Sequence, residues 1–145
     1  MVVHVIKAKE DKVTTADLVE DLKKNSKIDY SGAIFTFEGI VRGKEESMQL
    51  NKLILTTPDI DETQKEIEKI VENAKIKYNV HEISVIHYVG EFYTGDMLFL
   101  VAVLGSHRNE TLKALIEVIE KVKFEVEFKK EEISNEGTKT ILAGG

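Results

Sequence analysis

The order of apolar and polar positions along the chain predicts alternating strands and helices. Short apolar or alternating runs predict strands at 2–7, 33–41, 49–56, 82–89 and 97–104. Residues 97–104 contain no charged side chain, which is typical of a strand buried on both faces. The segment 44–47 between two of these strands is polar and is expected to form an exposed loop. A sheet with a buried central strand is therefore expected to form the core.

Three segments show the spacing of amphipathic helices. The first helix is expected to begin at Thr14 or Thr15, either of which can cap it, and to end near Lys24. The second follows Pro58 and runs for roughly five turns. Its expected core-facing residues are Ile67, Ile70, Val71, Ala74 and Tyr78.

The third helix is expected to begin at a cap on Asn109. Its expected core-facing residues are Leu112, Leu115, Ile116, Ile119 and Val122. Two further strands are expected, at 124–128 from its alternating pattern and at 138–142. The elements together predict an α+β fold of two layers, with a mostly antiparallel sheet and two long helices, in a single domain covering 1–145.

Composition and charge exclude several classes of function. The net charge of −6 over 145 residues argues against nucleic-acid binding, which needs a broad basic face. The chain has no cysteine, which excludes disulfides and thiolate chemistry. Neither a membrane span nor a leader segment is visible, so a cytoplasmic protein is expected. The scattered His4, His81 and His87 lack metal-ligand spacing, and we expect His87 to be structural.

Basic residues follow two of the predicted strands. The chain has only two arginines, Arg42 and Arg108, and each follows an apolar run. His107 and Arg108 lie where a strand meets a helix N-terminus, a position that favours anions. Such residues are equally consistent with turns and ordinary surface cations. Arginine nevertheless grips phosphate or carboxylate at two points, so an anion site remains a hypothesis.

Three blocks of sequence resemble the large, catalytic subunit of molybdopterin synthase, the MoaE family. They are 32–42 (GAIFTFEGIVR), 86–96 (IHYVGEFYTGD) with 106–108 (SHR), and 122–131 (VKFEVEFKKE). The order and spacing agree with the family pattern over about three-quarters of the chain, except for one apparent deletion between the lysines of the last block.

The resemblance implies an α/β-hammerhead-like fold and a sulfurtransferase that needs no cofactor. Family members convert cyclic pyranopterin monophosphate into the molybdopterin dithiolene. The sulfur comes from the thiocarboxylated Gly-Gly tail of a small ubiquitin-like subunit, bound to a homodimer of the large subunit in a heterotetramer. Lys123 and Lys129 match the catalytic lysines. The matched substrate-binding residues are Arg42, His107, Arg108, Phe37 and Lys130. A lysine crowded by cations has a lowered pKa, which makes Lys123 a candidate for proton transfer or a covalent intermediate.

The chain departs from the family pattern at several positions. Tyr88 replaces an arginine, Phe128 replaces a tryptophan, and Glu125 and Glu127 stand near the expected anion site. A non-catalytic homologue that acts as a binding or assembly protein is therefore an alternative. The terminal pair 144–145 is Gly-Gly, which makes a sulfur carrier a further alternative, although flexible terminal glycines need no such role.

Overall fold

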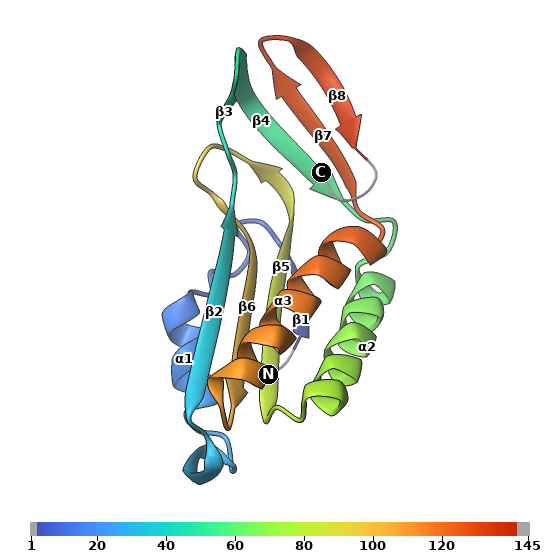
Figure 1. Ribbon diagram of the computed structural model, residues 1–145. Helices are drawn as coiled ribbons and strands as arrows, with labels where there is room; N and C mark the ends of the chain where they lie inside the picture. Colours follow the sequence, from blue (N-terminus) through green and yellow to red (C-terminus); the bar gives the residue numbers. More distant parts are fainter. Residues whose placement is uncertain (1–2, 142–145) are drawn as a thin grey trace.

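The computed structural model describes residues 3–141, and an eight-stranded sheet lies at its centre (Figure 1). The main strand order is β2-β6-β5-β4-β7-β8, with β1 beside β5 and β3 beside β4. The β1–β5 pair is parallel, and the other described pairs are antiparallel. The strands are β1 (Val3–Lys7), β2 (Ala33–Ile40), β3 (Lys44–Glu45), β4 (Met48–Thr56), β5 (Glu82–Phe92), β6 (Met97–Gly105), β7 (Lys129–Ser134) and β8 (Gly137–Ile141). The predicted α+β fold with a mostly antiparallel sheet is confirmed.

Helices cover both faces of the sheet. The long helices α2 (Ile60–Tyr78) and α3 (Arg108–Glu125) lie side by side on one face, and the short α1 (Thr15–Leu22) packs on the other (Figure 1). A 3₁₀ turn, η1 (Ile28–Tyr30), precedes β2. Within 3–141 no helix combines the length and the apolar run needed to cross a bilayer.

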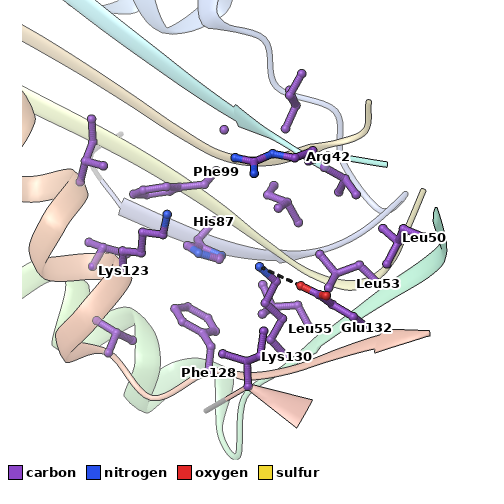
Figure 2. Close-up of a pocket in the computed structure, with 18 of the residues that line it drawn as sticks. Arg42, Leu50, Leu53, Leu55, His87, Phe99, Lys123, Phe128, Lys130 and Glu132 are labelled. Atoms are coloured by element: carbon purple, nitrogen blue, oxygen red, sulfur yellow. Dashed lines mark ion pairs between the residues drawn. The ribbon is translucent and has the colours of Figure 1, made fainter. Parts of the chain in front are cut away.

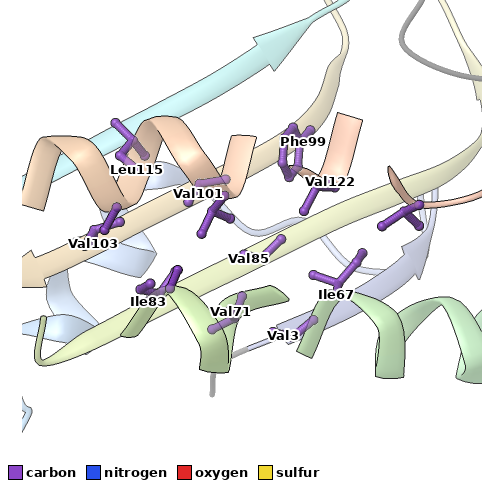
Figure 3. Packing of buried hydrophobic residues seen from close by; sticks show 14 of the residues in the cluster. Val3, Ile67, Val71, Ile83, Val85, Phe99, Val101, Val103, Leu115 and Val122 are labelled. Carbon is purple, nitrogen blue, oxygen red and sulfur yellow. The ribbon is translucent and has the colours of Figure 1, made fainter. Parts of the chain in front are cut away.

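The buried strand β6 separates two hydrophobic clusters. Val101 and Val103 point toward α2 and α3, where they pack with Val71 and Val122 (Figure 3). Leu100, Ala102 and Leu104 point to the opposite face and pack with Leu18 and Leu22 of α1. Both faces of β6 are thus buried, which explains its unbroken apolar sequence.

Two of the three α-helices, α1 and α2, begin at a side chain that caps their N-terminus. Thr14 and Asp17 form a capping box at α1, and the Asp59 carboxylate accepts hydrogen bonds from the first backbone N–H groups of α2. The prediction for α3 was wrong, because His107 and not Asn109 is at its N-cap position, and it makes no side-chain cap.

The predicted strand at 124–128 was also wrong. Helix α3 continues to Glu125, and the chain becomes extended only at Val126. Val122 and Val126 are both buried while Phe124 faces solvent. The buried residues are therefore four positions apart, as in a helix, and not two positions apart, as in a strand. The following strand, β7, begins at Lys129.

The core-facing side of α3 differs from the predicted one at two residues. Thr111, Ala114, Leu115, Val118 and Val122 are buried. Leu112 and Ile116 remain 41% and 51% exposed. The helix therefore presents apolar side chains away from its own core.

Gly90 changes the course of β5. Residues before it pair with β1 and β6, whereas Gly90 and the residues after it pair with β4. Gly90 has a φ of +131°, a conformation that residues with a side chain rarely adopt. The bend directs β5 toward an arm formed by β4, β7 and β8 (Figure 1). The segment predicted as a loop at 44–47 forms the short β3–β4 hairpin within this arm.

Candidate functional site

A cavity of about 600 Å³ lies between the end of α3 and the arm (Figure 2). Apolar side chains of β2, β4 and β6 form much of its wall, among them Phe37, Leu53 and Phe99. Among residues 3–141, its charged lining consists of three cations and three carboxylates: Arg42, Lys123, Lys130, Glu45, Glu120 and Glu132.

The three cations come from segments far apart in the sequence. Arg42 follows β2, Lys123 lies in the last turn of α3, and Lys130 lies in β7. Burial lowers the pKa of Lys130 below its ordinary 10.5, and the charges of Lys123 and Arg42 lower it further against the opposing effect of Glu132. The cations are therefore close enough to act on one another, as an anion site requires.

Two of the three carboxylates that line the cavity pair with these cations. Arg42 Nη1 lies 3.3 Å from Glu45 Oε1, with both side chains mostly exposed. Lys130 Nζ lies 3.9 Å from Glu132 Oε1 (Figure 2). An exposed ion pair such as Arg42–Glu45 contributes about 1 kcal/mol or less. An incoming phosphate or carboxylate can therefore replace Glu45 on Arg42 at little cost.

His87 lies in the cavity wall between two aromatic rings (Figure 2). Its ring stacks on Phe128 at 4.2 Å between centroids and lies 4.9 Å from Phe99. The Nδ1 atom lies 3.0 Å from the carbonyl oxygen of Tyr88, which can only accept, so Nδ1 carries the proton. Burial lowers the pKa of His87 to about 4. Period-two alternation placed His87 on a strand, but nothing in that pattern indicated that its face borders a cavity.

The predicted site residues separate into two groups. The cavity lining includes Phe37, Arg42, Lys123 and Lys130. Lys129 is not part of it; its side chain is exposed and pairs with Glu131 at 3.2 Å. Neighbouring residues of a strand point to opposite faces, which explains why Lys130 enters the cavity and Lys129 does not.

His107 and Arg108 lie at the other end of α3. Both are exposed and absent from the cavity wall. At 1.5 Å per residue, the helix separates Arg108 from Lys123 by about 22 Å along its axis. One copy of the chain therefore does not bring His107 and Arg108 to the cavity.

The departures from the family pattern lie mainly outside the cavity. Tyr88 is buried on the α1 side, where its hydroxyl oxygen accepts a hydrogen bond of 2.9 Å from the Val13 backbone N–H. Glu125 and Glu127 are exposed and do not line the cavity. Only Phe128 is a cavity residue.

Two expectations concern metal binding and the terminal glycines. Within the described part of the chain, no three side chains of His, Cys, Asp or Glu gather as a metal site would require. Gly144 and Gly145 lie outside the described residues.

Known proteins are similar to this chain in both sequence and fold. The family model described as "MoaE protein" matches residues 8–125. The molybdopterin synthase catalytic subunit of Haemophilus influenzae is 34% identical over 113 residues, which cover 77% of this chain and 74% of that protein. The crystal structure of molybdopterin synthase from Staphylococcus aureus superposes with a TM-score of 0.81 at 25% identity, covering 95% of each chain. A complex of subunits 1 and 2 of the molybdopterin-converting factor from Helicobacter pylori has a TM-score of 0.72 at 24% identity, covering 99% of this chain and 90% of that one.

The family model matches residues 8–125, and the Haemophilus influenzae protein is 34% identical over 77% of the chain. These two matches show that the chain belongs to the MoaE family.

Proposed function

We propose that the chain is the catalytic subunit of a molybdopterin synthase. It transfers sulfur from the thiocarboxylated tail of a small ubiquitin-like subunit to cyclic pyranopterin monophosphate and forms the dithiolene of molybdopterin. The observation that carries the proposal is the gathering of Arg42, Lys123 and Lys130 in one cavity of a chain whose net charge is −6. Membership of the family and the name of the Haemophilus influenzae relative support it.

The cavity suits the charges of the proposed reactants. The precursor carries a cyclic phosphate and the donor tail ends in a negative thiocarboxylate, so both need cations in a partly desolvated site. Arg42 takes the phosphate in a two-point contact by giving up its weak pair with Glu45.

Two lysines that line the cavity have different roles in the proposed reaction. Lys123 is the reacting lysine, because it matches a catalytic lysine of the family pattern and lines the cavity. Lys130 is the proton acceptor, because its lowered pKa gives it a larger neutral fraction near neutrality. Lys129 matches the second catalytic lysine in sequence, but it pairs with Glu131 outside the cavity lining, so it is not the proton acceptor in this proposal.

A second copy of the chain completes the proposed site. His107 and Arg108 are too far from Lys123 within one copy, so they act on the cavity of a partner. The exposed Leu112 and Ile116 lie on the same helix and provide an apolar surface that the partner covers. Each cavity of the homodimer also receives a small subunit, which gives a heterotetramer; the Helicobacter pylori structure, a complex of two subunits, is compatible with this assembly.

Reconstitution tests the function directly. The purified chain is mixed with the pterin precursor and a thiocarboxylated small subunit, and the product is measured as a fluorescent pterin derivative. We expect product with this donor and none with a small subunit that ends in an ordinary carboxylate. The exposed variant Lys65→Ala, which lies on α2 away from the cavity, is expected to match the parent. Binding of both reactants without product would support the non-catalytic alternative.

A further inference from the structure

His87 presents only one edge to the cavity. Phe128 covers one face of its ring with an interplanar angle of 16°, and Phe99 packs against it at 33°. Nδ1–H donates to the Tyr88 carbonyl oxygen. A ligand in the cavity can therefore reach His87 at its Nε2 edge and not by stacking on it.

The Nε2 atom has an unused lone pair. No hydrogen bond to Nε2 occurs within residues 3–141. In the same part of the chain, no side-chain nitrogen or oxygen that is fully buried lacks a partner. His87 is only 7% exposed and lines the cavity, so its remaining accessible surface includes Nε2, open to the cavity.

The ring is neutral at physiological pH. Burial lowers its pKa to about 4, and a second proton would add a positive charge to a cavity already lined by Arg42, Lys123 and Lys130. The carboxylates Glu45, Glu120 and Glu132 line the same cavity; two of them pair with its cations. His87 thus supplies an uncharged acceptor of fixed orientation among charged groups.

We propose that Nε2 of His87 accepts a hydrogen bond from an N–H group of the bound pterin. This inference rests on the proposed function, which supplies a pterin as the ligand. In their charged forms the three cations only donate hydrogen bonds, so they hold the phosphate and the donor tail but do not recognise the N–H groups of the heterocycle. A charged carboxylate in the same place would repel the phosphate. The neutral imidazole recognises the heterocycle without weakening the anion site, and a site built to accept such a bond rejects analogues that lack the donor.

Calorimetry with two probes separates heterocycle recognition from anion binding. The probes are the cyclic pyranopterin monophosphate precursor and inorganic phosphate. His87→Phe keeps an aromatic ring but removes the acceptor, and we expect it to bind the precursor about tenfold more weakly, as the loss of one hydrogen bond predicts. Phosphate affinity should stay within about twofold. His87→Gln keeps an acceptor and should recover most of the loss. His4→Phe, which lies on β1 away from the cavity, is the matched control and should equal the parent.

¹⁵N NMR tests the proposal on the parent protein, without any substitution. In protein labelled with ¹⁵N-histidine, the Nε2 resonance of His87 should shift when the precursor is added and remain unchanged with phosphate alone. An unchanged resonance at saturating precursor overturns the proposal. Equal precursor affinity in His87→Phe and parent overturns it too, even if turnover falls, because the His87 acceptor would then contribute nothing to pterin binding. If the parent neither binds nor converts the precursor, the proposed function itself fails.

Discussion

Arg108 and Lys123 lie at opposite ends of the same helix, and only Lys123 lines the cavity. A helix is too stiff to bring residues about 22 Å apart into one site. If both residues act on one substrate, they must come from different copies of the chain. This geometry leads to a test in which mixing two inactive variants restores activity.

Mixing Arg108→Ala with Lys123→Ala should recover sulfur transfer. Each variant alone should be nearly inactive. After subunit exchange, about half of the dimers contain one chain of each kind, and one of their two cavities is intact, so about a quarter of the parental activity should return. Activity is measured before and after exchange. If Arg108 acted within its own chain, mixing would restore nothing.

Ile116→Glu should convert the homodimer into a monomer. The side chain is 51% exposed on α3, and a buried unpaired carboxylate at an interface costs several kcal/mol. Light scattering at micromolar concentration measures the mass. The control is Ile76→Glu on α2, where the side chain is 72% exposed; this change should leave the dimer intact. A dimer that survives in Ile116→Glu would place the interface elsewhere.

Lys123→Ala should abolish sulfur transfer while the small subunit still binds. One ammonium group contributes little to the contact area of a protein interface. Lys123→Arg should be almost as inactive, since a guanidinium keeps the charge but cannot readily lose a proton or form an imine. Reconstituted turnover and calorimetry with the small subunit measure the two effects. Retention of most of the rate in Lys123→Arg would show that the residue acts only as a cation.

Lys130 should determine the ascending limb of the pH–rate profile, on which the rate rises with pH. Its pKa is lowered by burial and by Lys123 and Arg42, so its neutral form is reached below the ordinary lysine value of 10.5. The parental rate should rise with pH and level off below that value. Lys130→Arg should lose this rise, because arginine stays charged. An unchanged profile in the variant would remove Lys130 from the proton transfer.

His87 should make the fold less stable in acid. The pKa falls from 6.5 in the unfolded chain to about 4 in the folded one. Between these values the unfolded state binds a proton that the folded state does not, so stability is lost as the pH falls from 6.5 to 4. The loss amounts to about 3 kcal/mol. In His87→Gln the decrease in unfolding free energy between pH 7 and pH 4 should be smaller by this amount, as measured by urea unfolding. An equal decrease in variant and parent would contradict the assignment.

Local patterns of apolar and polar residues predicted most of the strands and helices. Period-two and helical spacing placed the central strand at 97–104 and the long helix after Pro58, because local burial repeats with the geometry of each element. They failed at 124–128, where Phe124 belongs to the exposed side of α3. They also misplaced Leu112 and Ile116, which are exposed, because the helical spacing of apolar residues is the same whether they face the core or the surface.

Which candidate residues share a site depends on long-range packing that the local patterns did not predict. Arg42 follows β2, Lys123 lies in α3 and Lys130 lies in β7. The pairing of β4 with β7 and the bend at Gly90 bring these segments around one cavity. Local spacing contains no information on such long-range packing. For the same reason it could not separate Lys130 from Lys129 or reveal the stacked, neutral His87, since burial and the pKa depend on neighbours distant in the chain.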